Sequence, residues 1–198
     1  LQTELKFLKS QYHPHFLFNA LNTVYFQIDE SNKAPRRTLE MISELLRYQL
    51  YGGNQKVSIL QEIDYLKTYI ALRKLRMSER LRLRVEFPPE LNELNIYPLL
   101  FLPLVENAFK YVGGDYQLDI IMKWENNRIS LFIRNSIPEL SAEDEALRKS
   151  VDKRQRKGIG LVNLRRRLSL LYPNKHRLET RKEETEFVAE LMIEIEDI

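Results

Sequence analysis

The spacing of apolar residues changes once along the chain, and this change limits the folds that its 198 residues can adopt. Up to about residue 77 the apolar positions recur at intervals of three and four, which is typical of amphipathic helices. From Leu81 to Phe87 they recur at every second position, and two prolines follow, which indicates a strand and its end. We therefore expect a helical domain over residues 1–78 and a mixed domain over residues 79–198.

Capping and turn residues divide the helical part into three helices. Pro35 suits the first turn of a helix, where a missing backbone N–H costs nothing. Ser58 can cap the start of another helix, with Gln61 or Glu62 closing the capping box. The three helices are expected over residues 1–28, 35–52 and 58–77.

The mixed part is predicted to combine helices with a hairpin-containing sheet. Two alternating segments flank Glu125-Asn126-Asn127-Arg128, which is typical of a turn between antiparallel strands. The sum is an α+β fold, with helices against one face of a mostly antiparallel sheet. Helices are expected over residues 97–111 and 159–171, and strands over residues 81–87, 117–124, 129–134, 176–180 and 186–195.

Composition excludes several classes of protein. The chain has no cysteine, which rules out disulfides and thiolate metal sites, and its three histidines argue against zinc. It has no run of about 18 apolar residues that could cross a bilayer. The net charge of +3 conceals a basic block from Arg148 to Arg167, which is either a solvated loop or a loop that faces an anion. Aromatic residues are not interleaved with these charges, so direct nucleic-acid binding is not expected.

The first helix carries a polar interruption of its apolar stripe. The stripe begins at the first residue, as if the helix were cut from a longer one, and it ends at Tyr12, where Pro14 can kink a helix at a cost of ~3 kcal/mol. The positions that would continue the stripe hold His15, Asn19 and Asn22 on one helix face. Either the imidazole projects from a packed bundle for a chemical purpose, or it bridges polar groups inside the core.

Four runs of sequence resemble the LytS-type sensor histidine kinases. The run His-Pro-His-Phe-Leu-Phe-Asn-Ala-Leu-Asn over residues 13–22 resembles the phosphoacceptor box of that family, although the family usually has asparagine where His13 stands. Residues 45–48, 103–110 and 158–168 match further motifs in the same order and spacing. The resemblance covers nearly the whole chain. It implies a helical hairpin for dimerisation and phosphoacceptance, followed by a Bergerat-type α/β sandwich with a mostly antiparallel sheet.

The family resemblance implies an ATP-dependent protein-histidine kinase of a two-component system. His15 would be phosphorylated and would pass the phosphoryl group to an aspartate of a response regulator receiver domain, expected to be of the LytTR type. Asn19 and Glu106 are the other candidate catalytic residues, and the general base stays open. The resemblance further implies a homodimer that forms the cytoplasmic portion of a protein anchored in the inner or plasma membrane by helices before Leu1.

The resemblance also implies which residues bind ATP and Mg²⁺. Asn107 offers the amide oxygen that Mg²⁺ prefers, and Lys110 lies one helical turn further on, within reach of a phosphate. Gly158 and Gly160 open a helix whose N-terminal N–H groups can face phosphates. Residues 137–157 would form the ATP lid. Leu161 and Asn163 complete the nucleotide-binding residues on the same helix.

One departure from the wider kinase superfamily affects the expected nucleotide affinity. Asn135 stands where an aspartate usually accepts a hydrogen bond from the adenine amine, so the charge assistance that roughly doubles such a bond is lost. We expect weak ATP binding, and a degenerate dimeric transmitter with little or no kinase activity is one alternative. A chaperone- or topoisomerase-like ATPase of the GHKL fold is another, disfavoured because Pro103 occupies the position of the water-activating glutamate.

Overall fold

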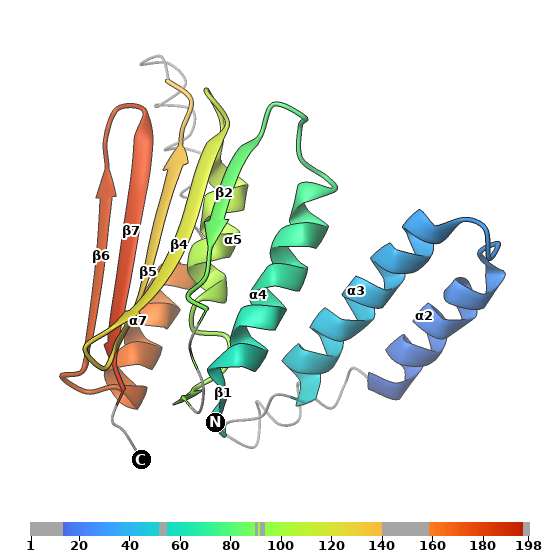
Figure 1. The fold of residues 1–198 in the computed structure, drawn as a ribbon, viewed down its shortest axis with the longest axis horizontal. Helices are drawn as coiled ribbons and strands as arrows, with labels where there is room; N and C mark the ends of the chain where they lie inside the picture. Colours follow the sequence, from blue (N-terminus) through green and yellow to red (C-terminus); the bar gives the residue numbers. More distant parts are fainter. Residues whose placement is uncertain (1–13, 52–54, 90, 92–93, 140–158, 196–198) are drawn as a thin grey trace.

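The computed structural model describes residues 14–51, 55–89, 91, 94–139 and 159–195 of the chain. A helical hairpin lies at one end of the molecule, a sheet lies at the other, and one further helix stands between them (Figure 1). The hairpin consists of α2 and α3, and the intermediate helix is α4. These three helices span Pro14–Gln27, Lys33–Tyr51 and Ile59–Lys74.

A local sequence signal accounts for where α4 begins. Pro14 is the first described residue of α2, and the residues before it, where the expected first half of the helix and the kink would lie, are outside the described part of the chain. Ser58 caps α4 by accepting a hydrogen bond from the backbone N–H of Leu60, while the Gln61 side chain accepts from the Ser58 N–H at 3.1 Å. The predicted capping box is therefore confirmed, with Gln61 closing it.

A five-stranded sheet forms the body of the mixed part. Its strand order is β2-β4-β5-β7-β6, with β2 parallel to β4 and every other pair antiparallel. Helices α5 and α7 cover one face (Figure 1), so the predicted α+β fold is confirmed. The elements span Arg82–Glu86 (β2), Leu102–Tyr111 (α5), Gln117–Glu125 (β4), Arg128–Ser136 (β5), Ile159–Leu171 (α7), His176–Lys182 (β6) and Glu186–Glu194 (β7).

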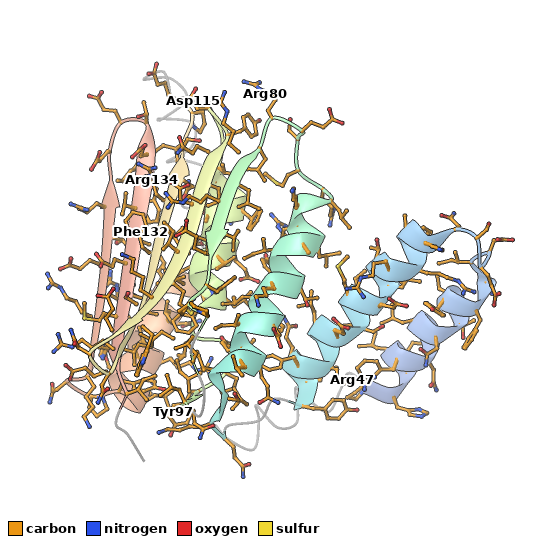
Figure 2. All side chains as sticks on the ribbon, viewed as in Figure 1. Arg47, Arg80, Tyr97, Asp115, Phe132 and Arg134 are labelled. Carbon is orange, nitrogen blue, oxygen red and sulfur yellow. The ribbon has the colours of Figure 1, made fainter. Side chains whose placement is uncertain are left out.

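Alternation along the strands separates an apolar face from a charged one. Leu131 and Ile133 of β5 are buried under the helices, whereas Phe132 and Arg134 lie on the opposite face (Figure 2). There Arg134 contacts Asp119 of β4 at 2.6 Å, and this hydrogen bond raises the pKa of the guanidinium. The open face of the sheet is therefore held by cross-strand ion pairing.

The predicted helix from residue 97 starts five residues later in the structure. Asn95–Ile96 forms a short strand, β3, that pairs antiparallel with β1, Val57–Ser58. Leu99 has a φ of 58°, in the left-handed region that a right-handed helix cannot contain. The pairing and the turn that follows it delay α5 until Leu102, and the periodicity of the apolar residues alone did not reveal either.

Helix α4 shares its core with the sheet rather than with the hairpin alone. Ile59, Ile63 and Leu66 of α4 are buried in the same cluster as Phe101 and Leu104. The chain division between residues 78 and 79 stays a prediction, and these contacts show that α4 is packed on both sides. No helix among the described residues is both long and apolar enough for a membrane span.

Candidate functional site

The imidazole of His15 lies on the surface of α2. Its side chain is exposed, as are those of Asn19 and Asn22 on the same helix. The Nδ2 atom of Asn19 lies 3.1 Å from His15 Nδ1. The alternative of a histidine enclosed in the core is therefore wrong for His15, and its ring is open to reagents while one nitrogen is held by its neighbour.

The contact between His15 and Asn19 engages Nδ1 of the imidazole and is compatible with either tautomer of the ring. The amide group of asparagine carries both a donor and an acceptor, so a half-turn of its side chain can serve either imidazole tautomer. When the amide oxygen accepts from Nδ1–H, Nε2 keeps a free lone pair and can act as a nucleophile. A neutral imidazole with its Nε2 outward is the form that a phosphoacceptor needs.

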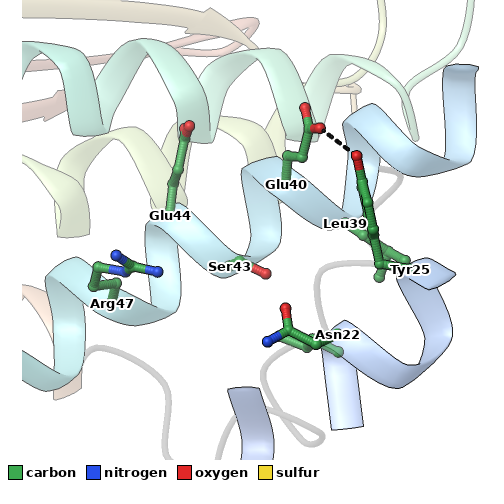
Figure 3. A pocket seen from close by; sticks show the side chains of 8 residues that line it. Asn22, Tyr25, Leu39, Glu40, Ser43, Glu44 and Arg47 are labelled. Carbon is green, nitrogen blue, oxygen red and sulfur yellow. Dashed lines mark hydrogen bonds between the residues drawn. The ribbon is translucent and has the colours of Figure 1, made fainter. Parts of the chain in front are cut away.

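A groove lies beside this histidine-bearing helix, between α2 and α3. It has a volume of about 410 Å³, and Tyr25 on one wall donates a hydrogen bond to Glu40 on the other at 3.1 Å (Figure 3). Arg47 also lines it and lies 5.7 Å from the ring of Phe18 on α2. The hairpin is thus joined by polar and aromatic contacts and leaves an open surface along its length.

Helix α5 carries three of the predicted site residues. Asn107 is partly buried and Lys110, one turn further on, is exposed near the ring of Tyr111. Glu106 belongs to the exposed residues, but its carboxyl group faces α4, where burial raises its pKa and Arg73 opposes this shift. Glu106 and Asn107 therefore present their side chains in different directions.

Asn135 lies at the end of β5 and is completely buried. Its Nδ2 donates to the Ser136 carbonyl at 3.2 Å, while its Oδ1 has no hydrogen-bond partner among the described residues. A buried acceptor without a partner is costly, and the exocyclic amine of adenine is a group that could satisfy it. The orphaned oxygen fits the predicted role of Asn135 in binding a nucleotide base.

The glycine pair that follows α5 meets this end of β5. Ser136 Oγ donates to the Gly113 carbonyl at 2.6 Å. A Cβ atom at Gly113 would lie 2.9 Å from Pro138 Cδ, and Gly114 has a φ of 62°. A side chain would therefore clash at Gly113 and strain the backbone at Gly114. The glycine pair brings the C-terminal end of α5 to the end of β5.

Helix α7 carries the remaining predicted residues. Gly160 and Asn163 are exposed, and Leu161 packs against the core. Gly158 and residues 140–157 of the predicted lid lie outside the described residues. Helix α7 contacts α5, which contacts β5, so the three elements that carry the predicted nucleotide-binding residues adjoin one another.

His15 lies apart from α5, β5 and α7. Helices α3 and α4 stand between α2 and α5 (Figure 1), so a single chain in this arrangement keeps the histidine apart from the nucleotide-binding residues. The predicted phosphoacceptor and the predicted nucleotide-binding residues therefore lie apart within one chain.

No cluster of three or more metal-ligating His, Cys, Asp or Glu side chains occurs in the described parts of the chain.

Sequence reasoning missed a buried polar cluster around Glu62. Glu62 is wholly buried on α4 and accepts hydrogen bonds from Tyr48 of α3 and from the backbone N–H of Leu99. Its position three residues after Ile59 and four before Leu66 placed it on the buried face of the helix. That spacing is the available signal for burial, although Glu62 is also a candidate to close the capping box of Ser58.

Comparisons with known proteins bear on the class of protein. Residues 3–81 match the family model described as histidine kinase. The sensor protein kinase HptS of Staphylococcus aureus strains USA300 and COL is 29% identical over 180 residues, which is 88% of this chain and 35% of that protein. The chain thus spans about a third of the length of the curated relatives it matches. The matches support a histidine kinase as the class of protein.

Similar backbones occur in solved histidine kinases. Acinetobacter baumannii AdeS is 13% identical, with 93% of this chain and 96% of that chain covered at a TM-score of 0.47. The catalytic domain of ThkA is 18% identical, with 70% and 94% covered at a TM-score of 0.45.

Proposed function

We propose that the chain is the transmitter portion of a LytS-type sensor histidine kinase that phosphorylates itself on His15 with ATP. The observation that carries this proposal is the exposed imidazole of His15, held through one ring nitrogen by Asn19. The phosphoryl group would then pass to an aspartate of a response regulator receiver domain of the LytTR type. Transfer of this kind depends on positioning and on charge neutralisation more than on covalent chemistry by the protein.

The nucleotide would lie against α5, the end of β5 and the start of α7. Asn107 would hold Mg²⁺, Lys110 a phosphate and Asn135 the base, while the helix opened by Gly158 and Gly160 would face the phosphates. Bound ATP supplies the phosphoryl group. The unpartnered Oδ1 of Asn135 supports this arrangement, because it is an acceptor that the protein itself leaves unused.

The proposed kinase works as a homodimer in the larger protein. The groove between α2 and α3 leaves the apolar Leu21 and Leu39 open along the hairpin, a surface that a second hairpin can cover. Either a second copy or a movement of the nucleotide-binding part must bring ATP to His15, because α3 and α4 intervene within one chain. Anchoring in a membrane and a cytoplasmic location belong to the same proposal.

Labelling with γ-³²P ATP tests the proposed activity. The wild-type chain should become labelled, and His15→Ala should remain unlabelled because the nucleophile is gone. His176→Gln is the control, since His176 begins β6, away from α2, and its Nδ1 lies 2.7 Å from the Tyr172 carbonyl. Asn107→Ala should also abolish labelling if it holds the metal. Equal labelling of His15→Ala would refute the assignment.

A degenerate transmitter is the second candidate, favoured by the neutral Asn135 in place of a carboxylate. Such a protein would dimerise and relay a signal without transferring phosphate. Light scattering would show its dimer, and titration calorimetry would detect no ATP binding even at millimolar nucleotide. ATP binding without labelling of His15, together with steady phosphate release, would instead indicate an ATPase.

A further inference from the structure

The carboxyl group of Glu62 joins three elements at a single oxygen. Its Oε2 accepts a hydrogen bond from the Tyr48 hydroxyl of α3 at 2.7 Å and another from the Leu99 N–H at 2.9 Å. Glu62 itself belongs to α4 and is wholly buried. Burial raises the pKa of Glu62, and the N–H groups of Leu99, Leu100 and Phe101, together with the Tyr48 hydroxyl, oppose that shift.

The backbone that Glu62 contacts is the turn directly before α5. Leu99 adopts a left-handed conformation there, which is unfavourable for a non-glycine residue and persists only where the surroundings enforce it. Phe101, at the N-cap of α5, offers no side-chain cap to the helix. Glu62 therefore supplies from another helix the acceptor that this turn lacks locally.

A second side chain holds the same turn from the opposite element. Arg167 of α7 donates to the Pro98 carbonyl at 2.7 Å and reaches the Leu99 carbonyl at 3.4 Å. Burial lowers the pKa of Arg167, and the charge of Glu62 opposes this. The turn over residues 98–101 is thus clamped between a carboxyl group and a guanidinium.

The clamped turn determines where α5 begins and hence where it points. Leu104 and Val105, in the first turn of α5, donate their N–H groups to the Phe101 carbonyl. Asn107 and Lys110 follow on the same short helix, and Tyr48 links the clamp to the hairpin of α2 and α3. One buried side chain accordingly connects the histidine-bearing hairpin with the helix of the nucleotide-binding residues.

We infer that Glu62 is a positioning residue, which holds the turn over residues 98–101 so that α5 presents Asn107 to the nucleotide, and which transmits the position of α3 to α5 through Tyr48. This inference rests on the proposed ATP-binding function for its last step. Its first step, the clamp on the turn, does not depend on any nucleotide.

Four variants of the 198-residue chain test the inference. Glu62→Met removes the acceptor and keeps an apolar side chain of similar size, a replacement that cores tolerate. Glu62→Gln keeps one oxygen that can accept both hydrogen bonds, so it should restore the clamp. Tyr48→Phe removes only the hydroxyl that reaches Glu62. Tyr65→Phe is the matched control, because Tyr65 stacks on Tyr48 but bonds to Gln49 instead.

Hydrogen–deuterium exchange without nucleotide measures the clamp, and calorimetry with ATP measures its effect on the site. Both are done at a temperature where circular dichroism shows every variant folded. Glu62→Met should speed exchange at Leu99 and in the first turn of α5, and should raise the Kd for ATP, each by roughly 5-fold or more. Glu62→Gln and Tyr65→Phe should stay near wild type, and Tyr48→Phe should fall between. If Glu62→Met does not fold, the inference is tested with Tyr48→Phe, which should exchange faster at Leu99 and bind ATP more weakly than Tyr65→Phe.

Unchanged exchange at Leu99 in Glu62→Met would overturn the inference that Glu62 holds this turn. An equal loss of protection from exchange in Glu62→Met and Glu62→Gln would overturn it too. Faster exchange with an unchanged Kd for ATP would overturn the step from the turn to Asn107. A wild-type chain that binds no ATP would contradict the proposed function instead, while the exchange rates would still decide whether Glu62 holds the turn.

Discussion

Asn135 brings two polar atoms into the interior of the sheet, and one of them has no partner among the described residues. Because the residue is buried at the end of β5, the unused oxygen is a constant cost in the absence of a ligand. The side-chain nitrogen donates to Ser136, which orients the amide and leaves the oxygen as the atom available to a base. The chemistry of this single residue therefore favours an amine-bearing base such as adenine.

Asn135→Asp should bind ATP more tightly and be less stable without it. An ionised carboxylate gains charge assistance with the adenine amine, and we expect the Kd for ATP to fall by roughly 5-fold. Without nucleotide the new charge is buried without a partner and repels the Ser136 carbonyl, so the thermal midpoint should fall. Calorimetry and thermal scans with and without ATP measure both effects. A submicromolar Kd for the wild-type protein would contradict the expected weak binding.

At the scale of elements, capping residues and clamps set where helices begin. Helix α4 starts at a capping box encoded within four residues, whereas α5 starts at a turn held by side chains of α4 and α7. The two helices thus depend on different ranges of the chain. A substitution at the capping box should affect mainly the N-terminus of α4. The N-terminus of α5, by contrast, depends on side chains that are distant in the sequence.

Ser58→Ala should lower the free energy of unfolding by about 1 kcal/mol, the usual cost of losing an N-cap hydroxyl. Urea unfolding followed by circular dichroism measures this change. Ser169→Ala is the control, because the Ser169 hydroxyl only bonds back to the Arg165 carbonyl within α7 at 3.0 Å and such bonds do not stabilise a helix. Equal effects of the two substitutions would show that the capping box contributes nothing specific.

For the whole molecule, a buried ionisable group makes global stability depend on pH. The pKa of Glu62 lies above its ordinary value of 4.5 because burial disfavours the charge. The groups that face it are the Tyr48 hydroxyl, the N–H groups of the turn and Arg167, and they offset only part of this cost. The folded protein therefore binds this proton more tightly than the unfolded chain does.

The stability contributed by the Glu62 proton should be complete below pH 4.5, the ordinary pKa, and should be lost as the pH rises through the higher pKa of the folded protein. The free energy of unfolding of the wild type, relative to Glu62→Gln, should thus decrease from pH 4.5 upward. Urea titrations at a series of pH values measure the difference. The exposed Glu79→Gln should show no such trend, and a flat difference for Glu62→Gln would mean that burial does not shift this group.

The sequence by itself determined the main helices and the strands of the five-stranded sheet, because apolar periodicity and capping residues act over a few neighbouring positions. It also pointed to His15, which interrupts an apolar stripe and proves to be exposed, and to the chemistry of Asn107 and Asn135. Only the tertiary structure decided that Asn135 is buried with a free oxygen and that α5 starts at Leu102. It alone revealed that Glu62 joins α3, α4 and the turn before α5. These features depend on hydrogen bonds between residues far apart in the chain, and the spacing of neighbouring residues carries no record of such partners.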